Sequence, residues 1–104
     1  MKLDEYQKIA TTFKIKTTPS KEKIECVFGL TEESGEVAGL MKRYYREGTL
    51  SIKKLEEELG DVMWYLSETC TRFGLSLQEV AEKNIKKLTD RKKRGKITGS
   101  GNNR

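Results

Sequence analysis

Hydrophobic residues recur at helical spacing along nearly the whole chain, and no stretch of useful length alternates as a β-strand does. Helical periodicity places apolar side chains every three to four residues on one face. Four segments carry this pattern and are predicted to be helices: residues 3–13, 21–46, 52–73 and 77–91. The pattern therefore predicts an all-α fold.

Capping residues delimit three of these segments. Ser20, Ser51 and Ser76 each precede a helical pattern and are expected to cap its first turn. Gly48 and Gly74 are expected to end the second and third helices, because glycine readily takes the left-handed conformation found there. Residues 14–20, which include the single proline, are predicted to be a loop.

The third segment has one apolar face and one polar stripe beside it. Trp64 lies almost opposite the apolar face and is expected to point outward, toward a partner subunit or a ligand. The stripe contains Glu58, Asp61, Tyr65 and Arg72. The apolar face consists of Ile52, Leu55, Leu59, Val62, Met63, Leu66, Cys70 and Phe73.

The second segment has a broad apolar side with two acids, Glu33 and Glu36, one turn apart on its flank. Gly35 and Gly39 lie in the same stretch, where each costs about 1 kcal/mol relative to alanine in a helix. Such a cost suggests that another backbone approaches closely there. The apolar side comprises Val27, Leu30, Val37, Ala38, Met41, Tyr44 and Tyr45.

The composition indicates a single domain with a thin core. The chain has 104 residues, of which 35% are hydrophobic and 36% are charged. A chain of this size buries a modest share of its surface, so self-association as a dimer or tetramer is expected. Residues 1–94 are predicted to form the domain, and the Gly-, Asn- and Ser-rich residues 95–104 a flexible basic tail.

The net charge of +5 is unevenly distributed. Residues 1–82 carry 12 Lys or Arg and 15 Asp or Glu. Residues 83–104 carry nine Lys or Arg and a single acid, Asp90. A basic end of this kind suits nucleic acid or polyphosphate equally well. With no signal-like or membrane-spanning stretch, the chain is expected in the cytoplasm and away from membranes.

The side chains that could bind a metal ion in this chain are carboxylates, which offer oxygen ligands. The chain has no histidine and only two cysteines, Cys26 and Cys70, which argues against a zinc site, a di-iron carboxylate site or a disulfide framework. If the second and third helices pack antiparallel, the pair Glu33 and Glu36 can face the pair Glu58 and Asp61. Four carboxylates in one small volume require a cation, and oxygen ligation suits Mg²⁺, with Mn²⁺ as a substitute.

These motifs resemble those of the MazG-like nucleoside triphosphate pyrophosphohydrolases. The run Glu32-Glu33-Ser34-Gly35-Glu36 followed by Glu58-Leu59-Gly60-Asp61 is similar to the family pattern Glu-Glu-x-x-Glu and Glu-x-x-Asp. The similarity spans about residues 6–91. The resemblance implies a four-helix bundle-like, oligomeric fold and Mg²⁺-dependent hydrolysis of NTP or dNTP to the monophosphate and pyrophosphate.

The resemblance also implies residue roles. Glu33, Glu36, Glu58 and Asp61 would be the metal ligands. Glu32 would either bind metal or, together with Glu33, act on the attacking water. Tyr65 falls where relatives contact the nucleotide. Asn84, Lys87 and Arg91 share one face of the last helix, as in the Lys-Asn-x-x-Lys-Leu-x-x-Arg stretch of relatives, and would bind the phosphates.

Two other classes of protein remain as alternatives. The basic carboxyl-terminal end would also suit a small nucleic-acid-binding helical protein. The acids would equally be surface charge on a helical interaction module without catalysis. The sequence does not indicate which base or sugar is preferred, or whether the nucleotide is an ordinary or a damaged one. Nucleotide-pool control and house-cleaning are both compatible roles.

Overall fold

The computed structural model describes residues 1–104 and is entirely helical. Helices α1 (Leu3–Ala10), α2 (Pro19–Glu47), α3 (Ile52–Arg72) and α4 (Leu77–Lys93) follow in order, with a 3₁₀ turn, η1 (Thr11–Phe13), after α1. The all-α prediction is confirmed. None of the helices has the length and apolar character needed to cross a membrane.

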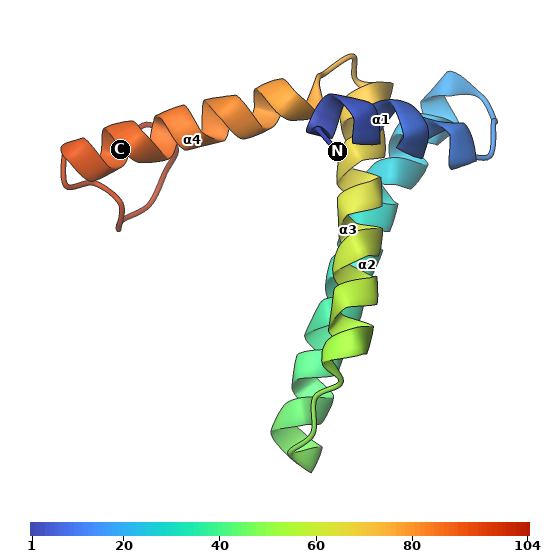
Figure 1. Cartoon of the computed structure of the whole chain (residues 1–104), viewed down its shortest axis with the longest axis horizontal. Coiled ribbons are helices and arrows are strands. Elements are labelled where there is room, and N and C mark those ends of the chain that lie inside the picture. Colours follow the sequence, from blue (N-terminus) through green and yellow to red (C-terminus); the bar gives the residue numbers. More distant parts are fainter.

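The helices α2 and α3 form a long antiparallel hairpin (Figure 1). Helix α1 lies across the open end of this hairpin, near the start of α2 and the end of α3 (Figure 1). Helix α4 turns away from that end and extends sideways, contacting α1 and α3 but not α2. The four helices therefore do not close into a bundle within one chain.

Local sequence signals set the helix bounds. The side-chain oxygens of Ser51 and Ser76 accept hydrogen bonds from the backbone N–H groups of Lys54 and Glu79, as expected of caps. Gly48 and Gly74 take positive φ values of 78° and 71° after the ends of α2 and α3.

The predicted cap at Ser20 is wrong. Thr18 is the N-cap, and its side chain accepts from the backbone N–H of Lys21 at 3.4 Å. Pro19 occupies the first helical position, where its fixed φ suits a helix and its missing N–H leaves no donor unpaired. The proline therefore starts α2 rather than belonging to the preceding loop.

A single glutamine joins α1 to the corner between α3 and α4. The Gln7 amide donates to the side chain of Thr71 at 3.0 Å and to the carbonyl of Leu75 at 2.9 Å. Its own carbonyl accepts from the backbone N–H of Leu77 at 2.8 Å. These three bonds connect α1, the end of α3 and the start of α4.

The predicted outward orientation of Trp64 is wrong, because α1 and η1 cover that side of α3. The Trp64 indole donates to the carbonyl of Ala10 at 3.0 Å and is only partly exposed. Its ring meets the ring of Tyr65 edge-on, with centroids 4.9 Å apart. Trp64 thus holds the α1–η1 segment against the hairpin.

Much of the predicted apolar surface stays exposed. Only nine of 104 residues are buried. On α3, Cys70 is buried and Leu55, Val62 and Met63 are partly buried. Other members of the two predicted apolar faces remain exposed in the single chain, namely Ile52, Leu59, Leu66 and Phe73 on or just after α3, and Val27, Ala38, Met41, Tyr44 and Tyr45 on α2.

The close approach of helices occurs at Gly29 and not at Gly35 or Gly39. A Cβ at Gly29 would lie 2.6 Å from Cζ of Tyr65 and closer still to two other ring carbons. A Cβ at Gly35 would meet nothing within 4 Å, and one at Gly39 only an arginine side chain. The expectation of close backbone contact at Gly35 and Gly39 is therefore wrong.

This difference predicts opposite effects of alanine at two glycines of the same helix. Gly29→Ala should lower the free energy of unfolding by about 1–2 kcal/mol, because overpacking against Tyr65 outweighs the gain in helix propensity. Gly35→Ala is the matched control and should raise it by about 1 kcal/mol. Urea unfolding followed by circular dichroism measures both, and a stabilised Gly29→Ala protein would contradict the proposed packing.

Candidate functional site

Three carboxylates from the two hairpin helices converge on one point. Glu33 comes from the middle of α2, and Glu58 and Asp61 lie one turn apart on α3. One oxygen from each lies within 4.8 Å of the others. Antiparallel packing of α2 on α3 brings them together, as the spacing of the two acid pairs predicted.

The electrostatics of this acidic cluster (Glu33, Glu58 and Asp61) suit a cation. Partial burial raises the pKa of Glu33 above its ordinary value, and the neighbouring charges of Asp61 and Glu58 raise it further. Carboxylate oxygens without histidine or cysteine are the ligands preferred by hard divalent cations such as Mg²⁺ and Mn²⁺. The residues present therefore fit a divalent metal ion.

Two other acids that the sequence predicted to act at this site lie beside the acidic cluster rather than in it. Glu36 is one turn beyond Glu33 on α2, is exposed, and does not belong to the group of converging oxygens. Glu32 is also exposed and lines a cavity on the other side of Tyr65. The structure thus brings together three of the four predicted metal ligands.

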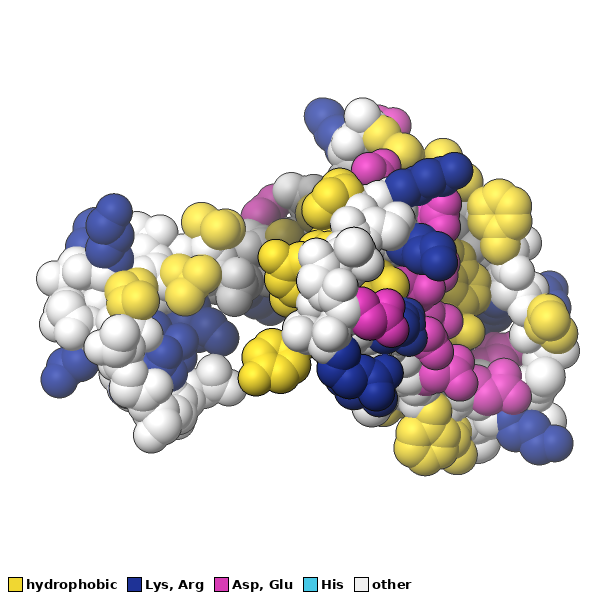
Figure 2. Space-filling view, turned by 90° about the horizontal axis from the view of Figure 1, so that it is seen from below, with side chains coloured by type: hydrophobic (Ala, Val, Ile, Leu, Met, Phe, Trp, Pro, Cys, Tyr) yellow, Lys and Arg dark blue, Asp and Glu magenta, His cyan; other side chains and the backbone are white.

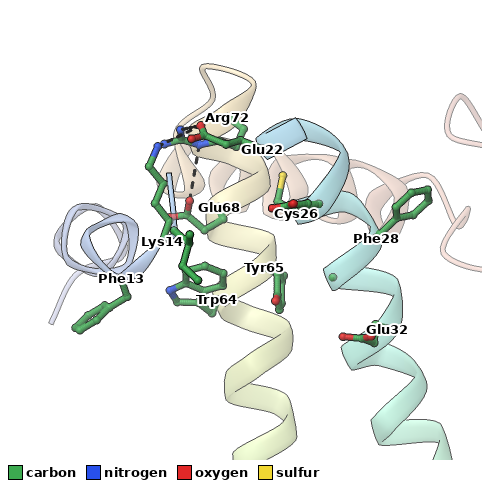
Figure 3. A pocket seen from close by; sticks show the side chains of 13 residues that line it. Phe13, Lys14, Glu22, Cys26, Phe28, Glu32, Trp64, Tyr65, Glu68 and Arg72 are labelled. Atoms are coloured by element: carbon green, nitrogen blue, oxygen red, sulfur yellow. Dashed lines mark hydrogen bonds and ion pairs between the residues drawn. The ribbon is translucent and has the colours of Figure 1, made fainter. Parts of the chain in front are cut away.

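A cavity of about 530 Å³ opens next to the acidic cluster, where the segment after α1 meets the hairpin. This volume is within the range of about 300–1,000 Å³ that small-molecule sites occupy. Figure 3 shows Tyr65 between α3 and α2, and Trp64 and Glu68 on the side of α3 that faces Lys14. The lining combines aromatic walls with several charged groups.

Tyr65 connects the cavity with the acidic cluster. It lines the cavity, and burial together with the charges of Glu33, Glu32 and Asp61 raises the pKa of its phenol. Its ring rests against Gly29, where any side chain would displace it. The residue predicted to contact the nucleotide therefore lies between the acidic cluster and the cavity of about 530 Å³.

An ion-pair network closes one end of the cavity. The Glu22 carboxylate accepts from Arg72 at 2.7 Å, from Lys14 at 3.3 Å and from the backbone N–H of Thr17 at 3.0 Å. The bond from Thr17 and the pairing with Arg72 lower the pKa of Glu22. Figure 3 shows this network above Glu68 and Trp64.

The sequence patterns did not single out Glu22 or Glu68. Glu68 is 2% exposed, and Arg72 Nε lies 3.7 Å from one of its oxygens. A signal for Glu68 was present, because it lies four residues before Arg72 and seven after Asp61, on the polar stripe of α3. No comparable signal marks Glu22, since its shortest bond is to Arg72, fifty residues later in the chain, and its other partners, Lys14 and Thr17, lie in the irregular segment before α2.

The predicted phosphate-binding residues lie apart from the acidic cluster of their own chain. Asn84, Lys87 and Arg91 are on α4, which does not contact α2. Arg91 is buried by the tail and donates to the carbonyl of Asn102 at 2.7 Å, while Lys87 donates to the Asn102 side chain at 3.3 Å. Figure 2 shows acidic side chains together with basic ones on the hairpin side, whereas the charged side chains around α4 and the tail are mainly basic.

Comparison of the sequence with known proteins shows the family to which the chain belongs. The model of the MazG nucleotide pyrophosphohydrolase domain matches residues 22–95, which contain most of α2 and all of α3 and α4. The chain therefore belongs to the MazG family. It is also 41% identical over 81 residues to the Gene 37 protein of Mycobacterium phage L5, covering 73% of this chain and 71% of that protein. No solved structure matches the chain significantly.

Proposed function

We propose that this protein hydrolyses nucleoside triphosphates, ribo or deoxy, to the monophosphate and pyrophosphate in a reaction that depends on Mg²⁺. The observation that carries the proposal is the convergence of Glu33, Glu58 and Asp61 from two helices onto one point. Membership of the MazG nucleotide pyrophosphohydrolase family supports it. Mn²⁺ is expected to substitute, because it accepts the same oxygen ligands.

The residues of the site have distinct proposed roles. Glu33, Glu58 and Asp61 hold the cation, and Glu36 joins them by a change of side-chain rotamer from the adjacent turn of α2. A bound divalent cation would neutralise the triphosphate and activate water. Glu32 and Glu33 position the attacking water at the α-phosphorus and take its proton. Tyr65 holds the nucleoside beside the acidic cluster.

The proposed role of the protein is nucleotide-pool control or house-cleaning in the cytoplasm, where its substrates are found. The test is a panel of NTPs and dNTPs, including oxidised and methylated forms, assayed for pyrophosphate with Mg²⁺ and with a chelator. Pyrophosphate release that stops when the chelator is added is the expected result. Absence of release from every member of the panel would refute the proposal.

Nucleic-acid binding is the second candidate function, favoured by the basic α4 and tail standing away from the acidic hairpin. Phosphate contacts of that kind weaken steeply with salt. This alternative predicts salt-sensitive binding of DNA or RNA with no hydrolysis of triphosphates. Thermal unfolding with and without Mg²⁺ distinguishes the two candidate functions, since only a metal-dependent hydrolase gains thermal stability from Mg²⁺.

We also propose that the chain self-associates. Its buried core is small, and exposed apolar side chains such as Met41, Leu59 and Leu66 form a surface that a second copy would cover. Light scattering at micromolar concentration should therefore give a dimer or tetramer. A stable, catalytically active monomer is the result that contradicts this prediction.

A further inference from the structure

Glu68 lines the cavity, and its buried carboxylate has a free hydrogen-bonding position. Its side chain is 3% exposed, and Oε1 has no hydrogen-bond partner. The nearest cation is the Arg72 guanidinium, whose Nε lies 3.7 Å from the other oxygen, too far for a hydrogen bond. A buried charged acceptor without a donor is costly, so this oxygen is suited to a ligand that brings one.

The other charged groups at this end of the cavity already have partners. Glu22 accepts from both Lys14 and Arg72, and Arg72 also donates to the side chain of Thr11 at 3.2 Å. Two atoms of these groups lack a hydrogen bond: Glu68 Oε1, an acceptor, and Arg72 Nε, a donor that lies 3.7 Å from the other oxygen of Glu68. A ligand in the cavity would therefore meet a negative acceptor rather than a free cation.

The walls of the cavity suit a flat aromatic ligand. Trp64 and Tyr65 present two rings at 89° to each other, and Gly29 leaves the space that the Tyr65 ring occupies. Stacking on aromatic side chains accepts every nucleobase, because each has a π-face. Selectivity among bases then has to come from a polar group such as Glu68.

We infer that the cavity receives the base of the nucleotide and that Glu68 Oε1 accepts a hydrogen bond from its exocyclic amino group. This inference rests on the proposed function and names its substrate class, the triphosphates of amino-bearing bases (adenine, cytosine and guanine). Uracil and thymine present a carbonyl oxygen where cytosine has its amino group, and two acceptors facing each other repel. Glu68 is a specificity-determining residue in this account.

Matched ligands test the inference without changing the protein. The two probes are non-hydrolysable α,β-imido triphosphates of adenosine and of purine riboside, which differ only in the amino group. Isothermal titration calorimetry in Mg²⁺ should show the adenosine analogue binding about 10- to 100-fold more tightly, as expected for a bond to a charged acceptor. Equal affinities, or no binding of either probe, would overturn the inference.

A conservative variant tests the proposed role of Glu68 in selecting the base. Glu68→Gln adds an amide that donates to the uracil carbonyl, so the ratio of affinities for the cytidine and uridine analogues should fall at least several-fold. The control is Glu25→Gln, which changes an exposed carboxylate on the same cavity and should keep the wild-type ratio. An unchanged ratio in a folded Glu68→Gln protein contradicts the assignment, and if this variant does not fold, the wild-type ligand pair decides.

Failure of this inference is distinguishable from failure of the proposed function. If all triphosphates release pyrophosphate at the same rate and the paired analogues bind equally, the base-selectivity inference is wrong and the proposed hydrolysis stands. If the analogues show the expected difference in affinity but no triphosphate is hydrolysed, the base site stands and the proposed hydrolysis is wrong.

Discussion

Replacing any carboxylate of the acidic cluster by its amide should reduce pyrophosphate release by at least about 100-fold. A metal ion at a phosphoryl group supplies several kcal/mol of transition-state stabilisation, and each 1.36 kcal/mol corresponds to about tenfold in rate. Glu33→Gln, Glu58→Gln and Asp61→Asn each remove one of the three converging ligands. The same loss is expected for Glu36→Gln if its side chain joins the site when the metal binds.

The fold should survive these changes. The three acids repel one another, as the raised pKa of Glu33 indicates, so neutralising one should stabilise the metal-free protein. Thermal unfolding with and without Mg²⁺ measures this, and the variants should lose the stabilisation by Mg²⁺ that the unmodified protein shows. The matched control is Glu57→Gln, next to Glu58 but exposed and outside the acidic cluster. Near-normal turnover in two of the four variants would refute the proposed site.

Lys87→Ala or Arg91→Ala should raise KM or lower kcat by roughly tenfold or more. Charge-assisted hydrogen bonds to phosphate oxygens are worth about 1.5–3 kcal/mol each. Within one chain these residues bond to Asn102 of the tail, and α4 lies away from the acidic cluster. The effect therefore requires α4 to reach the acids of a second subunit. Lys92→Ala is the matched control, since Lys92 is exposed and off this helix face.

Two comparisons decide where the phosphate contacts come from. Truncation after Lys93 removes the tail carbonyls that bond to Arg91 and should leave turnover largely intact. Loss of turnover on truncation, with normal activity of Lys87→Ala and Arg91→Ala, would assign the contacts to the tail. Mixing inactive Asp61→Asn subunits with Arg91→Ala subunits should restore activity if each site combines acids from one chain with α4 of another.

Local features of the structure were predictable from the sequence. Ser51, Ser76, Gly48 and Gly74 set helix ends through hydrogen bonds and backbone angles that depend on a few neighbouring residues. The two acid pairs were also predictable, because a short connection forces α2 and α3 to pack antiparallel. Residue spacing alone then brings Glu33 toward Glu58 and Asp61.

Features that depend on long-range packing were not predictable. Trp64 faces inward only because α1, more than fifty residues earlier in the chain, crosses that side of α3. The close helix contact falls at Gly29 because Tyr65 lies opposite it, a pairing that depends on the register of the two helices. The course of α4 away from the hairpin likewise follows from the bonds of Gln7 at the corner after α3.

The identity of the bond that is cleaved tests the central claim most directly. Hydrolysis of a deoxynucleoside triphosphate in ¹⁸O-labelled water with Mg²⁺ should give equimolar monophosphate and pyrophosphate, with the label in the monophosphate. Asp61→Asn, assayed in parallel, should give neither product above background. Release of inorganic phosphate and diphosphate, or equal product from Asp61→Asn, would contradict hydrolysis at the α-phosphorus by this site.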